Sequence, residues 1–151
     1  MKTIVFMRHA NALSSSQDGS DALRPLSPKG LEAAARAANV LKTRGVKPFK
    51  IITSPKLRAT QTAETVSKIL KAPAEERLEL GGAVNIVELW NFIKNETESG
   101  QTLVVIGHNP DISSLVTALV NNHIALNPAE FATVKFSDDF TAAELEPINP
   151  L

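Results

Sequence analysis

The sequence contains no cysteine among its 151 residues. This absence excludes a disulfide scaffold, a thiol nucleophile and a thiolate metal site together. It fits a reducing compartment, and we expect a cytoplasmic protein.

An excess charge of either sign is also missing, since sixteen basic residues balance sixteen acidic ones. A balanced chain of this kind is not typical of proteins that bind nucleic acid or membrane surfaces. No apolar run approaches the ~20 residues of a membrane span, and Met1–Met7 is too short and too alternating for a signal peptide. A chain of this length buries roughly 70% of its unfolded surface without help from a metal. We therefore expect one untargeted domain, residues 1–151.

Three short apolar runs rich in β-branched residues predict buried strands. They are Thr3–Met7, Phe49–Thr53 and Thr102–Ile106. Each run leads into a polar turn and then into a helical pattern. The tail alternates in the manner of an antiparallel edge hairpin, with strands at 131–136 and 141–146.

Four helices are predicted from apolar spacing and from their end signals. The first begins at Ser27-Pro28, a side-chain cap followed by proline, and stops at Gly45. The others cover 55–70, 84–98 and the segment after Pro110, which ends at Asn121. The residues predicted to face inward on the first helix are Leu31, Ala34, Ala35, Ala38 and Leu41.

Strands that alternate with helices predict a fold of class α/β: a three-layer sandwich whose mainly parallel central sheet carries helices on both faces. Ligands of such sheets bind at the carboxyl ends of the strands. Arg8-His9 follows the first predicted strand, Ser54 to Arg58 follows the second, and Gly107-His108 follows the third. If these strands are neighbours, two arginines and two histidines can enclose one tetrahedral dianion.

These residue types suit phosphoryl transfer. Guanidinium groups match two phosphate oxygens at once and keep their charge at any relevant pH. A neutral imidazole attacks phosphorus well near pH 7, particularly when a backbone carbonyl holds its other nitrogen and so fixes the tautomer. A second imidazole, if protonated, could stabilise the equatorial oxygens of the transferred group.

The combined motifs resemble those of the histidine phosphatase superfamily, the phosphoglycerate-mutase-like fold. The resemblance extends from Lys2 to about Leu145, and the short length together with Arg24–Gly30 looks like the SixA group of phosphohistidine phosphatases. The motifs that carry it are Arg8-His9 behind an N-terminal strand, Ser54-Pro55 with Arg58-Ala59 and Gln61-Thr62, and Gly107-His108 before a helix.

By this resemblance, His9 is the phosphorylated nucleophile, Arg8 and Arg58 bind the phosphate, and His108 is the second catalytic histidine. Alanine replaces the family's usual glycine at Ala10, and its methyl group is expected to alter the pocket slightly.

Two further polar residues are candidate phosphate ligands. Asn11 could offer an amide donor to the phosphate or could only stabilise a turn. Arg24 could bind phosphate or anchor its loop through an ion pair with Asp21.

The proton donor has two candidates. Glu79 lies roughly where many members of the superfamily carry a catalytic glutamate, and Asp21 lies in the loop where SixA-like proteins carry an acid. A phosphohistidine substrate depends less on such a donor, because its ring leaves as neutral imidazole when it is already protonated.

The sequence thus predicts a metal-independent phosphatase without an organic cofactor, which acts through phospho-His9 on phosphohistidine of a partner protein. Two alternatives stay open: hydrolysis of a small phosphate ester, and a module that binds phosphate or phosphoprotein without turnover.

Overall fold

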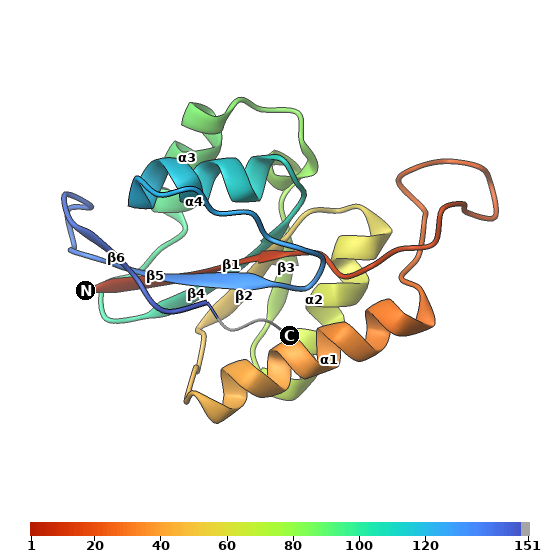
Figure 1. The fold of residues 1–151 in the computed structure, drawn as a ribbon, viewed down its shortest axis with the longest axis horizontal. Helices are drawn as coiled ribbons and strands as arrows, with labels where there is room; N and C mark the ends of the chain where they lie inside the picture. Colours follow the sequence, from red (N-terminus) through yellow and green to blue (C-terminus); the bar gives the residue numbers. More distant parts are fainter. Residues whose placement is uncertain (149–151) are drawn as a thin grey trace.

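The structure, a computed structural model, describes residues 1–148, so the last three residues of the predicted 1–151 domain lie outside the described part. Its elements alternate between strands and helices along most of the chain (Figure 1). In chain order they are β1 (Lys2–Arg8), α1 (Pro28–Thr43), β2 (Lys50–Thr53), α2 (Leu57–Leu70), β3 (Ala74–Glu76), the 3₁₀ helix η1 (Leu78–Gly81), α3 (Ile86–Asn95), β4 (Thr102–Gly107), α4 (Asp111–Val120), β5 (Phe131–Phe136) and β6 (Ala143–Leu145).

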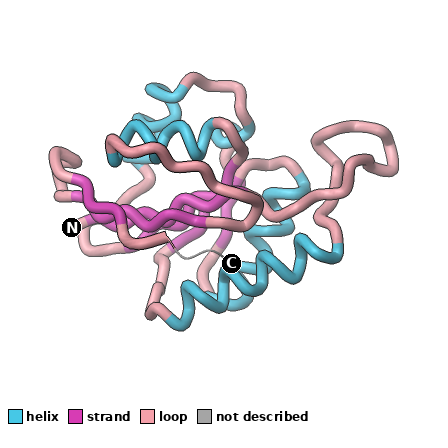
Figure 2. The backbone as a smooth tube through the Cα atoms, viewed as in Figure 1, coloured by secondary structure: helices cyan, strands magenta, loops and turns pink. Residues whose placement is uncertain are grey.

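One six-stranded sheet forms the middle layer, with the strand order β3-β2-β4-β1-β5-β6. The first four strands of this order pair in parallel, whereas β5 runs antiparallel to β1 and β6 antiparallel to β5. Figure 2 shows the sheet between two layers of helices. The predicted α/β sandwich with a mainly parallel sheet is confirmed.

Alternate residues of each central strand serve the two faces of the sheet. On β1, Ile4 and Phe6 join the core under α3 and α4, whereas Val5 and Met7 join the core against α1 and α2. All four are fully buried, as expected for a strand covered on both faces. Every helix among residues 1–148 is too short or too polar to span a bilayer.

The first helix begins as predicted, because the Ser27 side chain accepts a hydrogen bond from the Gly30 amide and proline follows it. Three of the five residues predicted to face inward, Ala34, Ala38 and Leu41, are fully buried, and the other two are not. Leu31 is 47% exposed and Ala35 only half-buried, whereas Ala37 is completely buried. Small residues at Ala34, Ala37 and Ala38 let the helix lie close to its neighbours, so the larger Leu31 is left outside.

Two features of the sheet differ from the sequence analysis. The short edge strand β3 and the 3₁₀ turn η1 had no predicted counterpart, because Ala74–Glu76 is fully exposed and lacks β-branched residues. The antiparallel tail hairpin is confirmed, but only β6 is an edge strand. β5 lies between β1 and β6, and all of its residues except Lys135 are buried.

Gly30 marks a close contact between α1 and the segment after β1. A Cβ atom at this position would lie 2.0 Å from the backbone oxygen of Asn11. The same oxygen accepts a hydrogen bond from the amide of Ser27. The start of the helix therefore fixes the path of the chain two residues beyond His9.

We expect Gly30→Ala to lower the free energy of unfolding by about 1–3 kcal/mol, because backbone must move to admit the methyl group. An unhindered glycine inside a helix would show the opposite sign, a gain of roughly 0.5–1 kcal/mol. Urea denaturation followed by circular dichroism measures the difference. Gly81→Ala is the matched control, since its Cβ would meet only the Cδ of Pro55 at an ordinary 3.8 Å. Equal or greater stability of Gly30→Ala contradicts the close contact.

Candidate active site

The carboxyl ends of β1, β4 and β2 lie side by side, with β4 in the middle. The amide of His9 donates to the carbonyl of Gly107 at 3.0 Å, and the amide of Ser54 donates to that of Ile106 at 3.1 Å. These bonds continue the sheet one residue past its strands. They place His108 between His9 on one side and Ser54 on the other, as the strand-end argument predicted.

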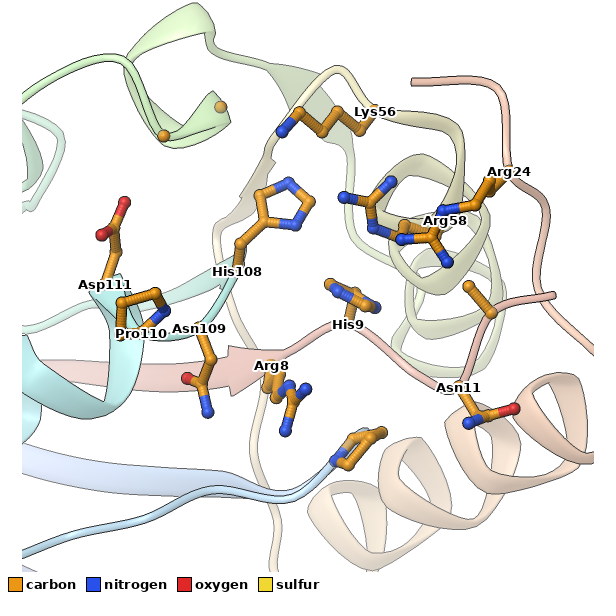
Figure 3. Close-up of a pocket in the computed structure, with 14 residues that line it drawn as sticks. Arg8, His9, Asn11, Arg24, Lys56, Arg58, His108, Asn109, Pro110 and Asp111 are labelled. Carbon is orange, nitrogen blue, oxygen red and sulfur yellow. The ribbon is translucent and has the colours of Figure 1, made fainter. Parts of the chain in front are cut away.

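The two histidine rings face the same space, with their centroids 5.0 Å apart and their planes inclined by 59° (Figure 3). Nδ1 of His9 is 2.7 Å from the backbone oxygen of Ala10. Since a carbonyl oxygen only accepts hydrogen bonds, this contact places the proton on Nδ1. Nε2 of His9 then carries the free electron pair, which is the tautomer that nucleophilic attack requires.

His108 is held from the other side. Its Nε2 lies 2.7 Å from the hydroxyl oxygen of Ser54, and both side chains are buried. Its Nδ1 is buried and has no hydrogen-bond partner among residues 1–148. In Figure 3 one nitrogen of the His108 ring faces His9.

The two arginines are anchored at one end of each guanidinium group. Arg8 donates through Nη1 to the carbonyl of Leu126 at 3.1 Å. Arg58, only 6% exposed, donates to the backbone oxygen of Asp21 at 2.9 Å and to its carboxylate at 3.1 Å. The Nε atoms of both arginines are buried without a partner in the described chain. Together with Nδ1 of His108 they make three unsatisfied nitrogens, and buried nitrogens of this kind are rare unless a ligand serves them.

Burial sets the protonation of both imidazoles. It lowers the pKa of His9 from 6.5 to about 4, an effect that the Ala10 carbonyl partly opposes and that the charges of Arg58 and Arg8 reinforce. It lowers the pKa of His108 to about 3, with smaller contributions from His9, Arg58 and Lys56. Both rings are therefore neutral near pH 7 in this structure. The structure thus favours a neutral His108 over the protonated ring that the sequence left possible.

A pocket of about 500 Å³ opens above these residues. Among residues 1–148, four cationic side chains line it, those of Arg8, Arg24, Lys56 and Arg58, against a single carboxylate, that of Asp111. Lys56 and Asp111 were not predicted from the sequence to belong to the site. Their positions could have indicated it, because Lys56 lies in the loop before Arg58 and Asp111 is the first residue of the helix after Gly107-His108. Its remaining lining residues are His9, Asn11, Ala12, Gly81, Gly82, His108, Asn109, Pro110 and Pro128.

Asp21 does not line the pocket but pairs with the cations beside it. Its carboxylate meets Nε of Arg24 at 3.0 Å, Nη2 of Arg58 at 3.1 Å and Nζ of Lys56 at 3.9 Å. Hydrogen bonds from Arg24 and Arg58 hold the pKa of Asp21 below its ordinary value. A carboxylate held in this way stays ionised at neutral pH, which does not suit a proton donor. The predicted pairing of Arg24 with Asp21 is present, and Arg24 reaches the pocket as well.

Glu79, the other predicted acid, lies in η1 and is not among the residues that line the pocket, although Gly81 and Gly82 of the same segment are. Ala10 is fully buried against Leu26, Ala34 and Ala129, outside the pocket lining. Its methyl group is therefore accommodated away from the expected phosphate, contrary to the predicted effect on the pocket.

Asn11 does line the pocket, at its exposed rim. The side-chain oxygen of Asn11 accepts a hydrogen bond from the hydroxyl of Ser27 at 2.8 Å. That bond ties the segment after β1 to the cap of α1. It leaves the amide nitrogen of Asn11 as the group that could serve a ligand.

The sequence profile of the histidine phosphatase superfamily (branch 1) matches residues 4–81. The chain belongs to this superfamily. The matched segment includes both members of the Arg8-His9 pair and Arg58, whereas His108 follows it along the chain. No group of three or more His, Cys, Asp or Glu side chains that could hold a metal occurs among residues 1–148.

Individual members of the superfamily extend the comparison. Phosphohistidine phosphatase SixA of Escherichia coli (strain K12) is 33% identical over 119 residues, which cover 77% of this chain and 73% of SixA. A structure of the protein histidine phosphatase SixA complexed with tungstate superposes with a TM-score of 0.86 at 27% identity, over 97% of this chain and 95% of that one.

A more distant structure shares the fold alone. A phosphoserine phosphatase from Entamoeba histolytica in complex with phosphoserine gives a TM-score of 0.71 at 14% identity, over 99% of this chain and 97% of that one. The family match and the SixA structure confirm the predicted phosphoglycerate-mutase-like fold, and the two SixA comparisons confirm the resemblance to SixA.

The neutral state of both imidazoles can be measured directly. We expect the ring-proton NMR signals of His9 and His108 to remain those of neutral imidazole between about pH 7 and pH 5, since burial lowers both pKa values to about 4 and 3. His9→Gln and His108→Gln each remove one signal and so assign them. A midpoint near 6.5 for either residue contradicts the burial argument.

Proposed function

We propose that this protein removes the phosphoryl group from phosphohistidine on a partner protein, by way of a phosphohistidine intermediate on His9. The observation that carries the proposal is the hydrogen bond from Nδ1 of His9 to the Ala10 carbonyl, which leaves Nε2 unprotonated beside two arginines and a second imidazole. Each of these groups has a role in the transfer of a phosphoryl group.

In the first step, Nε2 of His9 forms a bond to phosphorus while the bond between phosphorus and the substrate nitrogen breaks. The leaving ring carries a proton on its other nitrogen, so it departs as neutral imidazole. One P–N bond replaces another between chemically alike partners. The step therefore needs no strong proton donor.

The transferring group is held by side chains that line the pocket. Arg8 and Arg58 supply charged donors, and His108 supplies a neutral one when the Ser54 hydroxyl donates to Nε2 of its ring. Because each side chain is already anchored, little reorganisation accompanies the charge that develops on the oxygens.

In the second step, water forms a bond to phosphorus and the bond to Nε2 of His9 breaks. The hydrogen atoms of the water stay with the released phosphate and its surrounding solvent, and His9 returns to its neutral state. Its low pKa keeps Nε2 unprotonated for the next cycle.

Two observations support a protein as the substrate. The relative with 33% identity is a phosphohistidine phosphatase, and the tungstate complex is of a protein histidine phosphatase. The pocket of about 500 Å³ above His9, which we call the phosphate pocket, also opens at the surface beside a long loop. This loop, residues 12–26, projects from the body of the molecule in Figure 1. A side chain on a protein can reach such a pocket.

A second function, hydrolysis of small phosphate esters, is favoured by Asp111. This carboxylate is the only one among residues 1–148 that lines the pocket, and in Figure 3 it lies on the His108 side. An alkoxide leaving group, unlike imidazole, must be protonated as it departs. Asp111 is the group we propose for that protonation.

His9→Ala should lower the hydrolysis of phosphohistidine protein by on the order of 10³-fold or more, because the nucleophile is lost. With ³²P-labelled substrate quenched in base, wild type should carry label on His9, and the variant should carry none. His123→Ala, which removes an exposed histidine that does not line the pocket, is the matched control. Label on another residue, or binding of phosphate by wild type with no hydrolysis, contradicts the proposal.

The role of Asp111 depends on the leaving group. We expect Asp111→Asn to lower kcat on phosphoserine by about 10²-fold, but to change hydrolysis of phosphohistidine and p-nitrophenyl phosphate by less than about threefold. Glu79→Gln serves as the matched control and should leave all three rates near those of wild type. A leaving-group-dependent loss in Glu79→Gln, and not in Asp111→Asn, would assign the acid to Glu79.

A further inference from the structure

A second cavity, of about 710 Å³, adjoins the phosphate pocket on the side of the loop at residues 12–26. Four apolar residues line it, Leu13, Leu23, Pro25 and Leu57, and we refer to this cavity as the apolar groove. The remaining lining residues, 15–18, are polar. Nothing in the proposed chemistry at His9 uses these side chains.

Three chain segments contribute to both cavities, with neighbouring residues lining one cavity or the other. In the first segment Ala12 lines the phosphate pocket and Leu13 the apolar groove. In the second, Arg24 lines the pocket, while Leu23 and Pro25 line the groove. In the third, Lys56 and Arg58 line the pocket and Leu57 lines the groove.

Ion pairs connect two of the segments that line both cavities. Asp21 joins Arg24, Lys56 and Arg58, and Arg24 also donates to the Leu13 carbonyl at 2.8 Å. A ligand whose phosphate contacts Arg58 therefore lies next to the groove.

Hydrogen bonds within the chain hold the backbone of the segments that line the groove. The amide of Leu13 donates to the carbonyl of Pro25 at 2.9 Å, beside an antiparallel bridge between Ala12 and Leu26. The amide of Leu57 donates to the carbonyl of Ala22 at 2.9 Å, which ties the loop to α2.

Two leucines of the groove are nevertheless exposed to water. Leu23 is 51% and Leu13 44% exposed, although both belong to a loop fixed by hydrogen bonds. Covering apolar side chains with an apolar partner lowers the free energy of the system. Because these leucines lie beside the phosphate pocket, the polypeptide that carries the phosphoryl group is the partner placed to cover them.

We propose that the apolar groove binds an apolar side chain of the substrate polypeptide, close in space to the phosphohistidine that enters the pocket. This inference rests on the proposed function and narrows the substrate to proteins that carry an apolar residue beside the phosphorylated histidine. The groove supplies affinity for the polypeptide, and the pocket supplies the chemistry.

The test uses short fluorescent peptides that carry a stable phosphohistidine analogue, phosphoryltriazolylalanine, flanked either by leucines or by serines. We expect wild type to bind the leucine-flanked peptide about tenfold more tightly, as measured by fluorescence anisotropy. The double variant Leu13→Ser/Leu23→Ser should bind both peptides equally. Its inhibition constant for inorganic vanadate should equal that of wild type.

Leu31→Ser is the matched control, because Leu31 is 47% exposed and lines neither cavity. It should keep the preference for the leucine-flanked peptide. Equal affinity of wild type for both peptides overturns the inference, as does a preference that survives in the double variant.

Hydrolysis assays on phosphohistidine protein separate this inference from the proposed function. If the double variant hydrolyses phosphohistidine protein as wild type does, and wild type binds both peptides equally, the proposal for the groove is wrong and the proposed phosphatase activity stands. A preference for the leucine-flanked peptide that the double variant abolishes, with no turnover by wild type, retains the groove and rejects the phosphatase.

Discussion

The parallel pairing of β4 with β1 on one side and β2 on the other is the constraint on which the site depends. It brings His9, His108 and Ser54 to one edge of the sheet, although they are far apart in the sequence. Backbone hydrogen bonds beyond the strand ends then fix the spacing of the two imidazoles. Any loss of this register would separate the proposed nucleophile, His9, from the groups proposed to hold the phosphoryl oxygens.

Burial at this edge gives the site its chemical character. Both imidazoles stay neutral because burial disfavours their charged forms, whereas the arginines retain their charge. The result is an uncharged nucleophile within a cationic pocket, an arrangement suited to a dianion. Asp21 pairs with Arg24 and Arg58 beside this pocket and so helps to hold these two cations in position.

Much of the fold and the centre of the site could be predicted from the sequence. Buried parallel strands leave uninterrupted β-branched runs, and Ser27-Pro28 marks a helix start, so local patterns sufficed for the layers. Arg8, His9, Arg58 and His108 could be placed together because parallel strands end at one edge. The exposure of Leu31 on α1, the direction of the Ala10 methyl group and the pairing of Asp21 with Arg58 could not, since each depends on packing between distant segments. Asp111 was missed for a different reason. A carboxylate in the first turn of a helix stabilises that helix whichever way it faces, so its position alone does not indicate a site.

The most direct test of the account is a crystal structure with vanadate, which mimics the transferring phosphoryl group. The account predicts vanadium next to Nε2 of His9, with its oxygens within hydrogen-bonding distance of Arg8, Arg58 and Nδ1 of His108. Vanadate bound elsewhere, or bound here with the His9 ring turned so that Nδ1 meets the metal, would contradict the central claim that the Ala10 carbonyl prepares Nε2 as the nucleophile.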